Sequence, residues 1–158
     1  MPFSIQITTS GIDKTIGALK TAAMGLRDHR GFLKEEVQPL LKKEFTDVFR
    51  SRGYRKWRPL AASTLREKAE AGYPSAPLVR TRNYSRQSAQ LRGMSIRRNV
   101  LEIVSPIPYA KYHEFGTRRI PARPVFISVA DRIRNRLPDL YVAYARRKHL
   151  RELQRNTN

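Results

Sequence analysis

The 158-residue chain contains no cysteine, one tryptophan and only three histidines. Without cysteine it forms no disulfide, offers no thiolate ligand to zinc and has no cysteine nucleophile, a composition that fits a reducing compartment. No apolar run approaches the ~20 residues of a membrane span. The opening MPFSIQITTSG lacks the charged and apolar regions of a signal peptide. We therefore expect a cytosolic product with no membrane partner.

Acidic residues are scarce. Thirteen Asp and Glu stand against 32 Lys and Arg, a formal net charge of +19. The excess begins after residue 50, because residues 1–50 carry eight basic and six acidic residues and the remainder carries 24 and seven. Such charge favours nucleic acid, a membrane surface or an acidic protein as a neighbour, or serves solubility alone. It supplies phosphate affinity without reading a base sequence.

The apolar periodicity predicts a strand followed by two helices. Residues 3–9 alternate apolar and polar side chains, as a half-buried strand does. Apolar residues at three- and four-residue steps predict helices over 12–26 and 33–49. Pro39 lacks a backbone donor, so we expect a kink or restart there, and Gly53 ends the helix.

Residues 54–81 form a long proline-containing loop in this reading, with a short helix near 64–71 that Thr64 and Glu67 would cap. A further short helix is expected over 83–91. Two strands follow around 97–99, in which Met94 and Ile96 face Leu101 and Ile103.

The last part of the chain predicts a closing helix. Residues 125–129 suit either a strand or the entry to a helix, and an apolar stripe over 133–144 is interrupted by Pro138. We expect an α+β fold, with N-terminal helices and a closing C-terminal helix packed on a small antiparallel sheet. One domain would cover 1–145, and 146–158 would be a basic tail with a frayed end.

Residues 109–124, YAKYHEFGTRRIPARP, combine the types used in catalysis. A zinc helix that begins His113-Glu114 needs a second His at position 117, which is Thr. No paired-carboxylate spacing, nucleophile elbow or phosphate-binding glycine loop accompanies it. We therefore predict no enzyme, no metal and no cofactor, and expect His113 and Glu114 to hydrogen-bond a turn.

The aromatic residues of this stretch lie three apart, at Tyr109, Tyr112 and Phe115. This step favours packing of a short helix over base stacking. Gly116-Thr117 would form a bend, and 118–124 a stiff segment whose arginines face a neighbour or DNA. Trp57 suits equally an anchor of the core under the long loop and an anchor in an interface.

Three segments occur in an order that resembles a known family: WRPLAASTLREKAEAG at 57–72, PLVRT at 77–81 and YAKYHEFGTRRIPARPVF at 109–126. They resemble the tail completion proteins of tailed phages, grouped as phage virion morphogenesis proteins, over about 33–137. The chain departs from that pattern at Thr81-Arg82, where Thr-Gly is usual, and at Tyr84, where Leu is common.

The resemblance implies a structural virion protein, assembled in the host cytoplasm, that forms a neck ring and joins the completed tail to the DNA-filled head. The ring is commonly of six copies, with other neck and tail proteins as partners and duplex DNA in its channel. The alternative is a basic protein that contacts DNA directly. A nuclease-like role for His113 and Glu114 is the weakest of the three.

Two sets of candidate residues follow from this reading. The subunit or neck interface would comprise Trp57, Pro59, Leu60, Tyr109, Tyr112, His113, Glu114, Phe115, Gly116, Arg123 and Pro124. Contacts to DNA or to an acidic partner would come from Arg97, Arg98, Arg118, Arg119, Arg146, Arg147 and Lys148.

Overall fold

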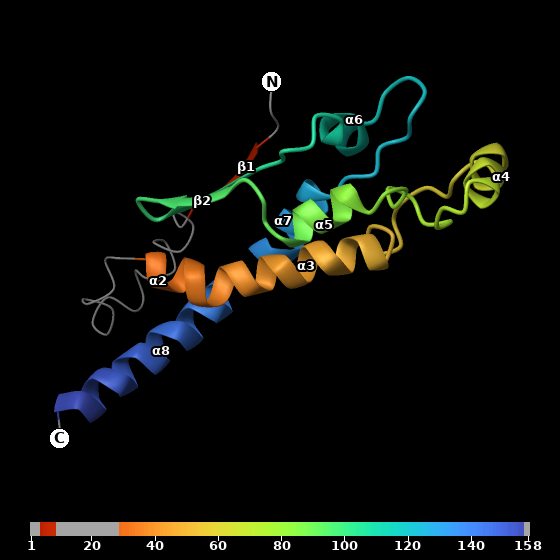
Figure 1. Cartoon of the computed structure of the whole chain (residues 1–158). Helices are drawn as coiled ribbons and strands as arrows, with labels where there is room; N and C mark the ends of the chain where they lie inside the picture. The colour runs from red at the N-terminus through yellow and green to blue at the C-terminus, as the bar shows by residue number, and fades with distance from the viewer. Residues whose placement is uncertain (1–3, 9–28, 157–158) are drawn as a thin grey trace.

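The structure, a computed structural model, describes residues 4–8 and 29–156 (Figure 1). It has the expected α+β architecture, in which a long helix lies beside a small antiparallel sheet and shorter helices. The helix expected over 12–26 lies outside the described residues. Within them, no helix is long and apolar enough to cross a bilayer.

The N-terminal helical element runs without interruption from α2 (Arg30–Phe32) through a π-helical turn (Leu33–Val37) into α3 (Gln38–Arg50). The wider turn is visible in the bond from the Gln38 N–H to the Leu33 carbonyl, five residues back. Pro39 therefore falls in the first turn of α3, where a missing donor is tolerated. The predicted restart at Pro39 is confirmed.

The antiparallel sheet has the strand order β1-β3-β2, with β1 at Ser4–Thr8, β2 at Met94–Arg97 and β3 at Val100–Val104. Met94 pairs with Ile103 and Ile96 with Leu101, as the alternation predicted. Both turn residues, 98 and 99, have positive φ angles, which is the geometry of a tight hairpin.

A projecting arm, residues 58–82, carries α4 (Ala62–Glu70) away from the rest of the molecule (Figure 1). The helix begins two residues earlier than expected, after Ala61, whose side chain makes no capping bond. The predicted cap at Thr64 is wrong, because Thr64 is already inside the helix. Gly72, with φ of 68°, ends the helix by taking the left-handed conformation that glycine favours.

Helix α5 (Asn83–Ala89) follows the arm and packs on α3 through Tyr84, whose ring meets Phe49 edge-on at 5.3 Å. Its preceding residue, Arg82, has φ of 59°. This is the position where the resembling proteins usually carry glycine, and a left-handed backbone is the reason glycine suits it.

The C-terminal part contains α6 (Ala110–Phe115), α7 (Phe126–Arg134) and α8 (Leu137–Asn156). The expected single closing helix is thus two helices, with the break just before Pro138. Fraying after residue 145 was also wrong, because α8 stays helical to Asn156. Tyr141 and Tyr144 pack α8 against Phe32, with ring centroids 5.1 and 5.6 Å away.

A buried carboxylate, Glu44, ties α3 to α7 and to the turn after α3. It pairs with Arg132 Nε at 3.0 Å and Arg136 Nη1 at 2.9 Å, and accepts a hydrogen bond from the Tyr54 hydroxyl at 2.8 Å. Burial and then the bond to Glu44 raise the pKa of Tyr54 far above its ordinary range. The charge of Glu44 is therefore fully matched by neighbouring groups.

Replacing Glu44 by Gln should lower the free energy of unfolding by about 1–3 kcal/mol, because two arginines lose a buried anionic partner. Asp47 offers a matched control on the same helix. It also has two cationic partners, Lys43 and Arg50, but its side chain is 20% exposed where that of Glu44 is 1%. Urea unfolding of E44Q and D47N measures both, and an equal loss in the two variants would contradict the role of burial.

Candidate functional site

Two segments that are distant in sequence are bonded together at the base of the arm. Trp57 Nε1 donates to the Pro124 carbonyl oxygen at 3.0 Å. The Arg123 guanidinium donates to the carbonyl oxygen of Arg58 at 3.1 Å and to that of Pro59 at 3.3 Å. We call these bonds the clasp. They join the Trp-Arg-Pro segment before the arm to the Arg-Pro segment before α7.

Trp57 itself belongs to the core. Its ring lies edge-on to Phe49 at 5.9 Å and covers Gly53, where an added Cβ would stand 2.2 Å from the indole. Gly53 also has φ of 68°, so both space and backbone favour glycine there. Of the two roles left open for Trp57, the core anchor is the one observed. Its place among the interface candidates stays a prediction.

Glu114 is buried and caps α7. Its Oε2 accepts bonds from the N–H groups of Val125 (2.8 Å) and Phe126 (3.1 Å), and Oε1 accepts one from Ile127 at 2.7 Å. These are N–H groups that lack partners at a helix start, where the dipole also favours an anion. Burial raises the pKa of Glu114, while the three bonds act in the opposite direction.

The expectation that His113 and Glu114 hydrogen-bond a turn is met only in part: Glu114 bonds backbone N–H groups, but those of a helix start 11 to 13 residues away, and His113 Nδ1 has no partner among the described residues. The Glu114 carboxylate is buried within the chain, and its place among the interface candidates stays a prediction. His113, the adjacent residue, instead lines a cavity on the other side of α6. The two side chains serve separate structures, so they do not form a catalytic pair.

The bend at Gly116 is confirmed and begins a loop that doubles back on α6. Gly116 has φ of 74°, and a Cβ there would stand 2.8 Å from the Ala122 backbone nitrogen. The Thr117 hydroxyl oxygen accepts the N–H of Ile120, and the Arg123 N–H reaches the His113 carbonyl at 2.7 Å. Arg123 is thereby held at the base of the arm, and its role toward a neighbour or DNA stays a prediction.

The aromatic side chains of α6 face outward. Tyr109 is 41% exposed, Tyr112 47% and Phe115 62%, whereas Ala110 and Glu114 form the buried side of the helix. The predicted packing holds for Tyr109, whose ring lies edge-on to those of Tyr84 and His113, and is wrong for Tyr112 and Phe115, which are largely exposed. Exposed apolar side chains gathered on one helix indicate a surface that a partner covers.

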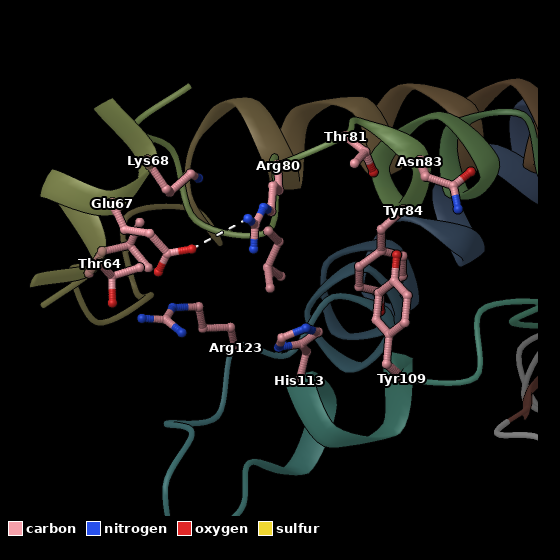
Figure 2. A pocket seen from close by; sticks show the side chains of 12 residues that line it. Thr64, Glu67, Lys68, Arg80, Thr81, Asn83, Tyr84, Tyr109, His113 and Arg123 are labelled. Atoms are coloured by element: carbon pink, nitrogen blue, oxygen red, sulfur yellow. Dashed lines mark ion pairs between the residues drawn. The ribbon is translucent and has the colours of Figure 1, made fainter. Parts of the chain in front are cut away.

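A cavity of about 650 Å³ lies between the arm on one side and α5 and α6 on the other (Figure 2). The arm contributes Lys68, Arg80 and Glu67, and an ion pair of 3.3 Å joins the last two. The lining residues are Leu60, Thr64, Glu67, Lys68, Leu78, Arg80, Thr81, Asn83, Tyr84, Tyr109, His113 and Arg123.

Three rings form one wall of the cavity. Tyr84 stacks on His113 at 6.3 Å, and Tyr109 stands edge-on to both. Burial, and secondarily the charge of Arg123, lowers the pKa of His113. The buried Tyr84 hydroxyl and His113 Nδ1 have no hydrogen-bond partner among the described residues. Both atoms are buried within this wall.

The sequence by itself does not mark the part of this site that the arm and α5 contribute. Lys68, Arg80 and Tyr84 were not among the candidates, because nothing in their local pattern marks them. The one feature of the sequence that could have pointed to them is their position inside or beside segments 57–72 and 77–81, which carry the family resemblance.

The remaining candidates are spread over the molecule. Pro59 is exposed and Leu60 half-buried at the start of the arm. The candidates for DNA or an acidic partner fall in three separate places: the hairpin turn at Arg97 and Arg98, the exposed loop at Arg118 and Arg119, and α8 with Arg146, Arg147 and Lys148. In α8, Arg147 is paired with Glu36 and Lys148 lies over the Tyr144 ring.

Comparison with protein-family models, curated proteins and solved structures gives no match to this chain. Within the described residues, no group of three or more His, Cys, Asp or Glu side chains could hold a metal ion.

Replacing Glu114 by Gln should destabilise the protein by about 1–2 kcal/mol, because an amide group then faces N–H donors that now meet a carboxylate oxygen. Glu70→Gln, an exposed residue of α4, is the control and should change stability by less than about 0.5 kcal/mol. Thermal and urea unfolding measure the difference. An E114Q protein as stable as wild type would contradict a stabilising role for the Glu114 cap.

Acidification should destabilise the fold through His113. Its lowered pKa means that the folded state holds the neutral imidazole, so its contribution is complete above the ordinary pKa of about 6.5 and is lost as the pH falls below it. His113→Gln should therefore flatten the stability profile between pH 7 and 5. Urea unfolding at each pH measures this profile, and an unchanged slope in H113Q would contradict the role of His113.

Proposed function

We propose that this chain is a structural virion protein of a tailed phage, a ring subunit at the neck that completes the tail and joins it to the DNA-filled head. The order of the resembling segments at 57–72, 77–81 and 109–126 suggests this role. The clasp supports it, because the first and last of these segments, far apart in sequence, are bonded to one another.

The observation that carries the proposal is apolar surface on a projecting arm and on the neighbouring α6. Helix α4 has nine residues, fewer than the ~12–15 that an isolated helix needs in water. Its Ala62, Leu65 and Ala69 are nevertheless exposed. Packing against a neighbour would supply what the helix lacks.

A closed ring requires each subunit to offer two different, complementary surfaces. The arm and α8 lead away from α3 at opposite ends of the molecule (Figure 1), so the chain can engage one neighbour at each end. The clasp anchors the arm at its base, which limits the directions in which it can reach. We expect six copies, the number that the resemblance implies.

The dispersed positive charge also suits a conduit. Duplex DNA carries one negative charge per ~1.7 Å of axis, so basic surface favours its passage. Arginines at three separate places give general attraction without one continuous binding groove. The alternative, direct DNA binding as the main activity, is favoured by the exposed basic residues of α8, Arg146 and Arg151 among them.

Replacing Phe115 by Ser should prevent ring formation and head–tail joining while leaving the fold intact, because the side chain is mostly exposed in the single subunit. Negative-stain electron microscopy and light scattering measure the assembly, and thermal unfolding checks the fold. Ile127→Ser on α7 removes an exposed side chain, 39% against 62%, outside α6, the arm and α8, and should retain the rings.

The wild-type protein decides between the two functions. Ring particles, or neck density in virions, support the structural role. A monomer that binds DNA with a steep salt dependence, and forms no ring at any concentration tested, would replace it with the DNA-binding role.

A further inference from the structure

Two buried cations face the cavity without a counter-ion. Arg123 is 6% exposed and Lys68 is 7% exposed. Lys68 Nζ donates to the Ala76 carbonyl oxygen at 2.7 Å, and Arg123 donates to the carbonyls of the clasp. All these acceptors are neutral, and neither cation forms an ion pair with any described residue. A buried charge without a partner of opposite sign is costly, so its presence calls for a reason.

The buried carboxylates Glu44 and Glu114, by contrast, do have charged or hydrogen-bonding partners. Glu44 has two arginines and a tyrosine hydroxyl, and Glu114 has three backbone N–H groups. Among the described residues that line the cavity, Glu67 is the one carboxylate, and it already pairs with Arg80 at 3.3 Å. Three cations and one carboxylate therefore line it. Burial lowers the pKa of both Lys68 and Arg123, the direction expected of uncompensated charge.

The cavity also has an apolar side. Leu60 and Leu78 line it with the ring of Tyr109, while the buried Tyr84 hydroxyl lacks a partner. Figure 2 shows the charged side chains and the aromatic group at different parts of the same hollow. A fitting ligand thus combines an anionic group with an adjoining apolar one. Lys68 already uses one of its three donors and Arg123 donates to two carbonyls, so one carboxylate suits them better than a phosphate dianion.

We propose that this cavity binds an acidic side chain, together with its apolar neighbour, from a segment of another protein. The inference rests on the proposed function, in which that protein is a neck or tail component. Charge complementarity selects such a partner over a second copy, since each copy carries a net charge of +19. Apolar side chains at the cavity and beside it on the arm, Tyr109 and Leu65, are 41% and 39% exposed. A protein segment covers them, whereas a small carboxylate does not.

The test uses the peptide acetyl-Ala-Leu-Asp-Phe-Ala-amide and its Asn counterpart as probes of the full-length protein, with binding followed by NMR at the His113 ring and the amides of the arm. The Asp peptide should bind saturably and the Asn peptide at least about tenfold more weakly, because only the first brings a charge to the cations. Phenylacetate tests whether a small molecule with a free carboxylate can occupy the cavity, and it should bind more weakly than the Asp peptide.

Lys68→Met keeps the apolar part of the side chain and removes its charge, so it should weaken binding of the Asp peptide at least about tenfold. The same change should leave the melting temperature of the unliganded protein equal or higher, because an unpaired buried charge is lost. Lys56→Met, at an exposed position outside the cavity, is the matched control and should alter neither. A purely structural lysine would instead give a lower melting temperature and unchanged binding, which overturns the proposal.

Other occupants give distinct results. Loss of self-association in K68M would identify a second copy as the occupant, and Lys68-dependent binding of the dinucleotide pTpT in place of the Asp peptide would identify nucleic acid. Either result overturns this inference. Wild-type rings that fail to bind the Asp peptide would overturn it too and leave the proposed ring standing, whereas peptide binding by a protein that never forms rings would contradict the ring alone.

Discussion

The guanidinium group of Arg123 is the contact on which the arrangement of the arm depends. It holds the carbonyls of Arg58 and Pro59, while Trp57 reaches the Pro124 carbonyl from the opposite direction. Because Arg123 comes at the end of the loop that Gly116 begins, α6, the loop and the base of the arm form one connected unit. The cavity, the exposed aromatics of α6 and the projection of α4 all follow from that connection.

Two of the few carboxylates of this basic chain serve the interior. Glu44 and Glu114 are both buried and fully bonded, one between helices and one at a helix start. Because these two carboxylates are buried, they do not neutralise the positive charge of the surface. The basic residues of the surface and the cations of the cavity therefore keep the positive charge that the composition gives the chain, a formal net charge of +19.

Periodicity accounts for most of what could be predicted. The long helix with its restart at Pro39, the hairpin register of Met94 opposite Ile103 and the bend at Gly116 all follow from local rules. The sequence-based prediction fails where one residue pattern fits two arrangements of a helix that differ only in which face packs against the rest of the protein. The aromatics of α6 share a helix face, but the buried face belongs to Ala110 and Glu114.

By itself the sequence determined the fold class, the excess of positive charge and the positions that require glycine, because these depend on residue type and on neighbours along the chain. Only the tertiary structure decided that Trp57 is a core residue, that Glu114 caps α7 and that Lys68 and Arg123 share one cavity. The physical reason is that hydrogen-bond partners and burial are set by segments tens of residues apart, such as 57–59 and 123–124, whose meeting no local pattern records.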